Sequence, residues 1–274
     1  RRRGRGRVER GHPAMRVPFS KMSGAGNDFV LLEGLPRGRS GAALARRLCD
    51  RRRGVGADGL LVLSRRGVRT RLDYWNADGS RAFCGNGSRC GALWAHAHGW
   101  TKGERFTLDT SGGPLAVRLT ARGRAEVDMP KPEGLEHHPR LKALGRMFSV
   151  HYVHTGVPHA VCFVTGVGEI DMKTLGRALR YHRAFGKAGA NVDFVSIRNG
   201  VLHLRTYERG VEDETLACGT GVVAAAAVAR SLKKTGDRVK VRTRGGHILR
   251  VSFSGGEARL EGPGETIFVG EVNI

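Results

Sequence analysis

Two short loops carry the side chains best suited to chemistry. One reads Phe83-Cys84-Gly85-Asn86-Gly87 and the other reads Ala217-Cys218-Gly219-Thr220-Gly221. In each loop a cysteine precedes glycines and a run of small residues that favours a helix, so each thiol is predicted at a helix N-terminus. The unpaired backbone N–H groups and the helix dipole there stabilise a thiolate and can also hold a carboxylate. Two such thiols facing each other across a carbon acid could move a proton from one face of it to the other without a metal.

The alternative is that both cysteines are small core residues. Glycine costs stability unless the backbone must approach something closely, and a core cysteine rarely needs glycines after it twice in one chain. Cys49, Cys90 and Cys162 lie instead in apolar periodic segments and are predicted as core residues. We therefore interpret Cys84 and Cys218 as the reactive pair.

Short strands separated by turns dominate the pattern around these loops, with few helices between them. Helices are predicted at 42–50 after a Ser40 cap, from Cys84 to about 98, at 171–185 and at about 219–232. Strands are predicted at 19–22, 29–35, 60–64, 69–76, 105–110, 115–120 and 125–129, and then at 149–154, 160–164, 192–197, 201–207, 238–243, 248–253 and 266–269.

The two halves of the chain repeat the same landmarks in the same order. Gly24–Asn27 corresponds to Thr155–His159, and Asn76–Gly79 before one cysteine corresponds to Glu208–Gly210 before the other. The cysteines are 134 residues apart (218 minus 84), about half of the 274-residue chain. A duplication of this period predicts two similar domains with a site between them. We expect the domains at 16–129, joined by a C-terminal strand at 265–274, and at 130–264, with a linker near Met129–Pro132.

The formal net charge of +22 raises the question of nucleic acid. The basic residues are scattered and only 6% of the chain is aromatic, so there is little material for stacking on bases. Nonspecific electrostatic binding at low salt is expected. A basic nucleic-acid-binding protein remains the alternative from a different functional class.

Other bulk features indicate the compartment. No segment approaches the roughly 18 to 20 apolar residues of a membrane span, and no signal peptide follows Arg1. Residues 1–15 are predicted as a disordered basic tail. Five cysteines, an odd number without a C-x-x-C pair, favour a reducing compartment over a disulfide scaffold or a structural zinc site. The expected location is cytoplasmic, with no membrane partner and no metal.

Two further motifs are interpreted as structural. Gly54–Gly59 matches G-x-G-x-x-G, but a helix precedes it and a strand follows, the reverse of the order that binds a dinucleotide. His96 and His98 are two residues apart on a predicted helix and face different sides, so a helix-end role is favoured over a shared metal.

The complete set of motifs resembles the diaminopimelate epimerase family. The matching strings are Met22–Phe29, Asn76–Ser80, Cys84–Gly87, Gly156–His159, Asn191-Val192, Tyr207–Gly210 and Ala217–Gly221, in family order from about residue 18 to the C-terminus. The resemblance implies an α/β (α+β) fold of two pseudo-symmetric domains, each a curled, mostly antiparallel sheet around a central helix, with the active site in the interdomain cleft. It also implies a homodimer that epimerises LL- to meso-diaminopimelate without pyridoxal phosphate or any other cofactor, for lysine and peptidoglycan synthesis.

The resemblance also assigns roles to individual residues. Cys84 and Cys218 would be the acid/base pair, since the two faces of the substrate need opposite roles. Backbone N–H groups of both loops are expected to stabilise the carbanion by holding its carboxylate. The substrate-binding and supporting residues are expected to be Gly85, Asn86, Gly219 and Thr220 at the carboxylate, Glu208 and Asn27 at the reacting ammonium, Asn76, Asn191 and Arg209 at the distal end, and His159 and Asp58 in support.

The nearest enzymatic alternative is another cofactor-independent racemase on the same duplicated fold, such as a relative of proline or histidine racemase. Retention of Glu208-Arg209 with Asn76 and Asn191 favours diaminopimelate. One departure is Val157, which stands where many family members have asparagine.

Overall fold

The computed structural model describes residues 15–274. The predicted basic tail therefore lies outside the described residues except for Met15. This residue exchanges two backbone hydrogen bonds with Ile274, at 3.2 and 2.9 Å. The described part of the chain thus begins and ends at the same place.

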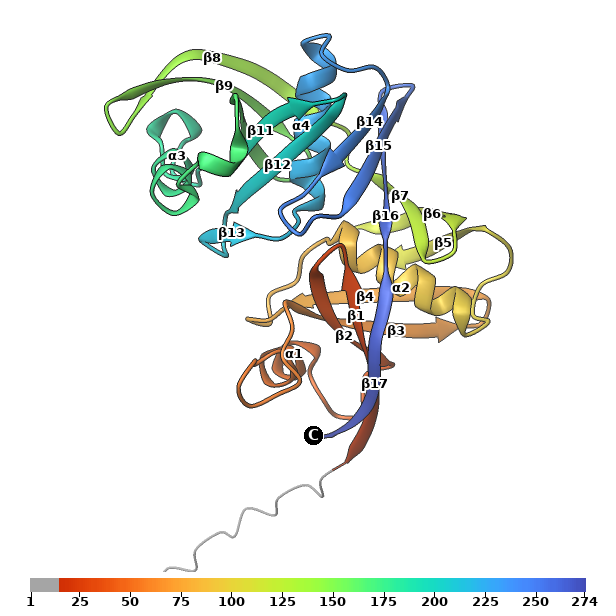
Figure 1. The fold of residues 1–274 in the computed structure, drawn as a ribbon. Helices are drawn as coiled ribbons and strands as arrows, with labels where there is room; N and C mark the ends of the chain where they lie inside the picture. Colours follow the sequence, from red (N-terminus) through yellow and green to blue (C-terminus); the bar gives the residue numbers. More distant parts are fainter. Residues whose placement is uncertain (1–14) are drawn as a thin grey trace, which may run out of the picture.

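The first half contains two α-helices and seven strands (Figure 1). The helices are α1 (Gly41–Leu48) and α2 (Gly85–Ala97). The strands are β1 (Arg16–Gly24), β2 (Asn27–Glu33), β3 (Gly59–Arg66), β4 (Arg69–Asn76), β5 (Arg105–Thr110), β6 (Gly113–Ala121) and β7 (Arg124–Met129).

The second half contains ten strands and two further α-helices. The strands are β8 (Glu133–Ala143), β9 (Arg146–His154), β10 (Pro158–Phe163), β11 (Asn191–Arg198), β12 (Val201–Glu208), β13 (Asp213–Thr215), β14 (Arg238–Arg242), β15 (Ile248–Ser254), β16 (Glu257–Pro263) and β17 (Glu265–Asn273). The α-helices are α3 (Arg177–Arg180) and α4 (Gly219–Ser231), and shorter turns are η1 (Val167–Glu169), η2 (Met172–Gly176) and η3 (Arg183–Phe185).

Strand pairing repeats from one half to the other. In the first half β1 is antiparallel to β2, β2 parallel to β3, β3 antiparallel to β4 and β4 parallel to β5. In the second half β9, β10, β11, β12 and β14 pair in the same four orientations. All other pairings are antiparallel. This confirms the predicted α/β fold with a large, mostly antiparallel sheet and few helices.

The two halves exchange their outer strands. After β7 the chain crosses over and β8 pairs with β9, whereas after β16 it crosses back and β17 pairs with β1. At the crossing β7 and β16 pair with each other, from Ala258 opposite Met129 to Pro263 opposite Arg124. One sheet of 17 strands therefore runs through both halves, and in Figure 1 the long β16–β17 segment runs from the crossing down along the first half to the C-terminus.

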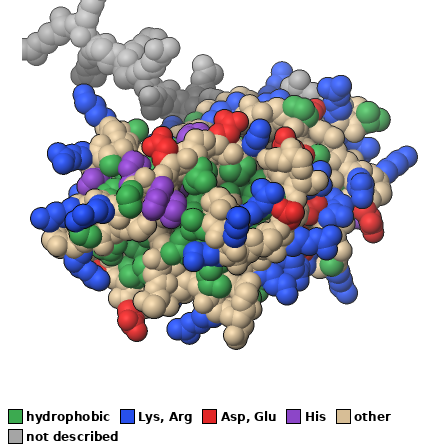
Figure 2. Space-filling view, turned by 90° about the horizontal axis from the view of Figure 1, so that it is seen from above, with side chains coloured by type: hydrophobic (Ala, Val, Ile, Leu, Met, Phe, Trp, Pro, Cys, Tyr) green, Lys and Arg blue, Asp and Glu red, His purple; other side chains and the backbone are tan. Residues whose placement is uncertain are grey.

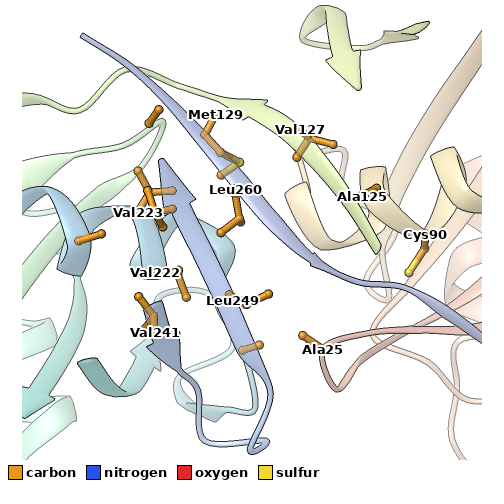
Figure 3. Packing of buried hydrophobic residues seen from close by; sticks show 14 of the residues in the cluster. Ala25, Cys90, Ala125, Val127, Met129, Val222, Val223, Val241, Leu249 and Leu260 are labelled. Atoms are coloured by element: carbon orange, nitrogen blue, oxygen red, sulfur yellow. The ribbon is translucent and has the colours of Figure 1, made fainter. Parts of the chain in front are cut away.

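Each half wraps its strands around one buried helix. Nearly every residue of α2 from Gly85 to Ala95 is buried, and most of α4 is buried as well. A helix that is enclosed on all sides needs small or apolar residues all round, which the alanines and glycines of both helices supply. Leu260 of β16 lies between Met129 of β7 and Val222 of α4, so the core is continuous between the halves (Figure 3).

Three strands are absent from the sequence prediction. Within residues 15–274, β8 is an edge strand that pairs with β9 alone, and most of its side chains are exposed, so it shows no apolar alternation. β16 alternates polar and apolar residues from Glu257 to Leu260, the pattern of a half-buried strand, so the prediction missed a local signal there. β13 has only three residues.

The prediction of one continuous α-helix at 171–185 is wrong. The segment forms a π-turn, one short α-helix and a 3₁₀ turn instead. The break comes at His182, whose backbone is extended (φ −66°, ψ 134°). The segment between α1 and β3 is a helix-to-strand turn, which confirms the structural interpretation of Gly54–Gly59.

Basic side chains are spread over the surface. On the face shown in Figure 2, Lys and Arg side chains lie around the whole outline with Asp and Glu among them, rather than in one stripe. Many arginines are paired with carboxylates, as in Arg205 with Glu214 at 2.6 Å and Arg250 with Glu261 at 2.9 Å. The positive charge is therefore partly neutralised within the fold.

Candidate active site

Cys84 and Cys218 are the N-caps of the two buried helices. Both have extended backbones (φ −137° and −116°), and their carbonyl oxygens accept the first helical hydrogen bonds, at 2.8 and 2.9 Å. The Cys84 sulfur also accepts the N–H of Gly87 at 3.3 Å, whereas the Cys218 sulfur contacts the Thr220 hydroxyl at 3.3 Å. The prediction that each cysteine precedes a helix is confirmed.

The first turns of α2 and α4 meet at the crossing of the two halves. The Asn86 side-chain amide donates to the backbone oxygen of Ala217, just before the second cysteine, at 3.4 Å. Leu260 lies against both first turns, because a methyl group built on Gly219 or Gly85 would lie 3.2 or 3.9 Å from its Cδ2 atom. The unpaired N–H groups of the two helices are thus brought into one region.

Asn27 and Asp58 lie beside Cys84. Asn27 Nδ2 donates to Asp58 Oδ2 at 2.6 Å, and its Oδ1 atom faces the Cys84 sulfur at 3.7 Å. Asp58 in turn accepts from Arg51 at 2.8 Å, and Arg51 also binds Asp28. An ionic network therefore fixes the orientation of the Asn27 amide.

Asn76 lies at the same end of the first sheet, because Gly59 pairs with both Asn76 and Phe29 across neighbouring strands. Its Oδ1 atom accepts the Tyr74 hydroxyl at 2.8 Å and its Nδ2 atom donates to Ser80 at 2.9 Å. Both ends of the amide are thus hydrogen-bonded within the first half.

Asn191, Glu208 and Arg209 occupy the corresponding end of the second sheet. Asn191 is buried, and its Oδ1 atom accepts the backbone N–H of Arg209 at 2.7 Å while Nδ2 donates to the Pro158 oxygen at 3.0 Å. Glu208 accepts from Thr215 at 2.9 Å. Burial raises the pKa of the Glu208 carboxyl.

His159 belongs to a buried chain of hydrogen bonds that ends at Cys218. Its Nδ1 atom lies 2.6 Å from Asp193 Oδ2 and its Nε2 atom lies 2.9 Å from the Thr220 hydroxyl, which contacts the Cys218 sulfur. The other oxygen of Asp193 accepts from Thr206 at 2.7 Å. His159 and Asp193 both have no exposed surface.

Arg89 is a fully buried cation behind Cys84. Its Nη2 atom donates to Asn86 Oδ1 at 2.8 Å and its Nη1 atom to the Gly85 oxygen at 3.4 Å. Its Nε atom has no hydrogen-bond partner among residues 15–274. Burial lowers the pKa of this guanidinium to about 10. The hydrogen bond to Asn86 turns the amide nitrogen of that residue toward Asn27 and Ala217.

Burial governs both thiols in this structure. It raises the pKa of Cys84 to about 11, despite the N–H of Gly87, and raises that of Cys218 well above its ordinary value, helped by Glu208 and Asp193. The expected stabilisation of a thiolate by each helix N-terminus is thus outweighed by desolvation.

The region of the cysteines is enclosed. A methyl group built on Gly26 would lie 3.2 Å from Leu216 Cβ, so the turn between β1 and β2 touches the other half beside Cys218.

A cavity of about 510 Å³ lies elsewhere, at the C-terminal end of α2, where Trp94, His98 and Arg122 contribute to its lining. No three His, Cys, Asp or Glu side chains within 15–274 form a metal-binding group. The two cysteines at these meeting helix N-termini are therefore the candidate site.

The sequence matches one known protein family over most of its length. The profile of the family described as diaminopimelate epimerase matches residues 19–134 and 151–261, which include both cysteines. The chain belongs to the diaminopimelate epimerase family. It is accordingly an isomerase of the epimerase type.

Relatives match this epimerase over nearly their whole length. It is 43% identical to the diaminopimelate epimerase of Methanothrix thermoacetophila, with 94% of this chain and 96% of that protein aligned. It is 39% identical to the diaminopimelate epimerase of Methanocella arvoryzae, with 94% and 98% aligned.

Solved structures of more distant proteins share the fold. A PhzF-family phenazine biosynthesis protein of Bacillus anthracis superposes with a TM-score of 0.76 at 14% identity, over 95% of this epimerase and 100% of that chain. A hydroxyproline epimerase of Agrobacterium vitis gives 0.68 at 16% identity, over 94% and 93%. None of the helices in residues 15–274 of the epimerase is long and apolar enough to cross a membrane.

Sequence reasoning missed Asp193 and Arg89. The sequence could have indicated a role for Asp193, because it is an acidic residue inside the apolar strand predicted at 192–197. Buried acidic residues are rare unless they are paired. Arg89 lies in a helix of small residues that was predicted to be enclosed, and a charged residue in such a helix also indicates a specific role.

Cys49, Cys90 and Cys162 are buried in the core as predicted. His98 ends α2 and binds the Trp94 oxygen at 2.8 Å, a helix-end role as predicted.

Proposed function

We propose that the epimerase interconverts LL- and meso-2,6-diaminopimelate with Cys84 and Cys218 as acid and base, without pyridoxal phosphate or a metal. The observation that carries the proposal is the pairing of two thiols at the N-termini of two buried helices whose first turns are linked by Asn86. The names of the relatives supply the substrate.

The reaction needs one cysteine as thiolate and the other as thiol. The thiolate forms an S–H bond as the α C–H bond breaks, and the electron pair moves onto the α-carbon and its carboxylate. The second thiol then delivers its proton to the opposite face, so a C–H bond forms and an S–H bond breaks. The enzyme ends with its two sulfurs in exchanged protonation states.

The substrate carboxylate takes the place of an electron sink. N–H groups of Gly85, Asn86, Gly219 and Thr220, at the positive ends of two helices, would hold it while charge develops. The substrate ammonium would add positive charge beside the buried thiols, which favours thiolate formation when substrate is bound.

The remaining residues would select the substrate. Glu208 and Asn27, on either side of the crossing, would hold the reacting ammonium. Asn76, Asn191 and Arg209 would hold the distal amino-acid group, with Asp58 orienting Asn27 and His159 acting through Thr220. A site that binds only one configuration at the distal centre turns racemisation into epimerisation at one centre.

We further propose a homodimer of two-domain subunits, acting in the cytoplasm in lysine and peptidoglycan synthesis. Among the described residues β17 pairs with β1 alone, and its Ile267, Phe268 and Val269 are 55%, 47% and 71% exposed. An unpaired edge with apolar side chains on both faces is suited to pairing with a second copy.

A reducing compartment such as the cytoplasm would keep both thiols free. The proposed domains are 16–129 with 265–274, and 130–264.

The test is deuterium incorporation at the α-carbon of LL-diaminopimelate in heavy water, with dialysed enzyme and no added cofactor. We expect one deuterium in each meso product molecule. Proline and histidine, tested in parallel, should show no exchange. Exchange into proline but not diaminopimelate would instead make the protein a racemase of another specificity.

A further inference from the structure

The same position beneath each cysteine loop is apolar in one half and ionisable in the other. Phe29 pairs with Gly59 in the first half as His159 pairs with Asn191 in the second, so Phe29 and His159 are equivalent. Two residues further along these strands, Leu61 is likewise equivalent to Asp193. The Asp193–His159 pair is therefore no requirement of the fold, since the first half forms the same scaffold without it.

Two neighbours of His159 assign its ring protons. Asp193 Oδ1 accepts from Thr206, and a carboxylate has only acceptors to offer at Oδ2, so His159 Nδ1 must donate to it. Asn191 Oδ1 accepts from Arg209 N–H, which turns Nδ2 toward His159 Nε2 at 3.4 Å. An amide nitrogen only donates, so Nε2 is an acceptor.

The direction of hydrogen bonding then continues to the sulfur. With Nε2 as an acceptor, the Thr220 hydroxyl donates to it at 2.9 Å. The Thr220 oxygen is left to accept from Cys218 at 3.3 Å. Cys218 must be the donor in that contact, which requires the protonated thiol.

We propose that Asp193 is a positioning residue that holds His159 as its neutral Nδ1–H tautomer and thereby holds Cys218 as a hydrogen-bond-donating thiol until it protonates the substrate. This inference rests on the proposed function, because it names the state in which one of the two cysteines waits. It gives the second half a built-in acid that the first half, with Phe29 and Leu61 beneath Cys84, does not share.

The negative charges around Cys218 also favour its protonated thiol. Asp193 on β11 and Glu208 at the end of β12 both act on Cys218, and both raise its pKa after burial itself. Asp193 also raises the pKa of the buried Cys162 on β10. Removing the Asp193 charge therefore favours the Cys218 thiolate, whichever way the His159 ring then turns.

The experiment is the pH dependence of iodoacetamide alkylation, read at Cys218 and Cys84 separately by peptide mass spectrometry. In Asp193→Asn we expect Cys218 to be alkylated about tenfold faster at a given pH below its midpoint, equivalent to one pKa unit. Cys84 in the same molecules is the internal reference and should keep its profile. Epimerisation should fall about tenfold or more.

Two variants control for structure. Asp193→Glu keeps the carboxylate and should restore a Cys218 profile close to that of the unmodified protein. Asp73→Asn removes another mostly buried strand carboxylate, paired with Arg71 and Arg81, and should change neither profile. Equal Cys218 profiles in Asp193→Asn and the unmodified protein would overturn the proposal.

A second measurement needs no substitution at Asp193. Nitrogen-15 shifts of the His159 ring, assigned with His159→Asn, should show the neutral Nδ1–H tautomer at pH 7 to 8, and the Nε2–H tautomer would contradict the proposal. Neither readout depends on turnover. If the unmodified enzyme fails to exchange the α-hydrogen of diaminopimelate, the proposed function fails while the role of Asp193 is still decided.

Discussion

Gly87 in the Cys84 loop lies over Leu61 and Phe29, whereas Gly221 in the Cys218 loop lies over Asp193 and His159. The backbones of the two loops are alike, since each cysteine caps a 13-residue helix followed by the same succession of strands. Duplication has therefore kept the scaffold that places a thiol and has varied the side chains beneath it. A reaction that needs an acid on one side and a base on the other benefits from such a difference.

A second contrast lies five residues after each cysteine. Arg89 holds this position in α2 and Val223 holds it in α4, and both are fully buried. The first half thus places a cation behind its thiol, and the second half places a carboxylate near its own. The two halves are thus alike in backbone arrangement and differ in the charged side chains buried within it.

The largest effect is expected from Cys84→Ala and Cys218→Ala, each lowering epimerisation by about 10³-fold or more. A lone remaining cysteine can remove a proton from one face only and must return it there. We therefore expect each variant to exchange solvent deuterium into only one of the two isomers, and the two variants to differ in which one. Nuclear magnetic resonance of recovered LL- and meso-diaminopimelate measures this. Exchange into the same isomer by both variants would refute the two-sided arrangement.

Arg89→Met separates charge from packing. Replacing a buried, incompletely bonded cation with an apolar side chain is often neutral or stabilising, so the free energy of unfolding should hold or rise. The Asn86 amide loses its anchor, and turnover should fall about tenfold. Val223→Ala at the equivalent position should do the reverse, costing about 2 kcal/mol of stability with little change in kcat. Urea unfolding and steady-state kinetics test both variants. If stability and turnover fall together in both, the two positions do not differ in the way proposed.

Gly87 and Gly221 should differ in how well each tolerates substitution by alanine, because different side chains lie beneath them. A methyl group at Gly221 would lie 2.6 Å from Asp193 Oδ1 and 3.2 Å from the Thr206 hydroxyl, both fixed by hydrogen bonds. At Gly87 the nearest atom is the end of Leu61 at 2.9 Å, which can turn aside. We expect Gly221→Ala to cost about 1 to 3 kcal/mol and Gly87→Ala clearly less. Thermal melting of the two variants decides between this order and its reverse.

The smallest effect concerns acid. Burial raises the pKa of Asp28, but Arg51 and Lys21 outweigh it and bring it to about 2. Because the folded pKa lies below the unfolded value near 3.8, Asp28 adds stability above pH 3.8 that is lost as pH falls through 2. The Asp28 side chain is 17% exposed, so its ion pairs are only partly screened and the loss should be about 1 to 2 kcal/mol. Urea unfolding at pH 5 and pH 2.5 should show it in the unmodified protein, and Arg51→Gln should reduce it.

Much of this arrangement followed from local sequence. Strands β4 and β5 have the predicted bounds, and α2 and α4 begin directly after the predicted cysteines, because apolar alternation and helix-start signals are local properties. β8 escaped because its place at an edge leaves polar side chains at successive positions, whereas β16 has the polar/apolar alternation of a strand and was a missed local signal. β8 pairs with the adjacent β9, but β16 pairs with β7 across 129 residues (258 minus 129).

The candidate site divides in the same way. The cysteines and their glycines were visible as a repeated string, and His159 and Asp58 were marked for support. The partners that orient them were not, since the contact of His159 with Asp193 spans 34 residues and that of Asn86 with Ala217 spans 131. Only the folded chain reveals which buried charge stands behind which thiol.

The exchange of outer strands has a consequence for synthesis on the ribosome. β1 is the first strand of the described chain to emerge, yet its partner β17 is the last. The second half, by contrast, receives β8 before any of its other strands. The second half can therefore close its sheet while the first still lacks the strand that pairs with β1, until β17 is translated. A stall or truncation before residue 265 would leave the Cys84 half open along β1 with the Cys218 half already formed.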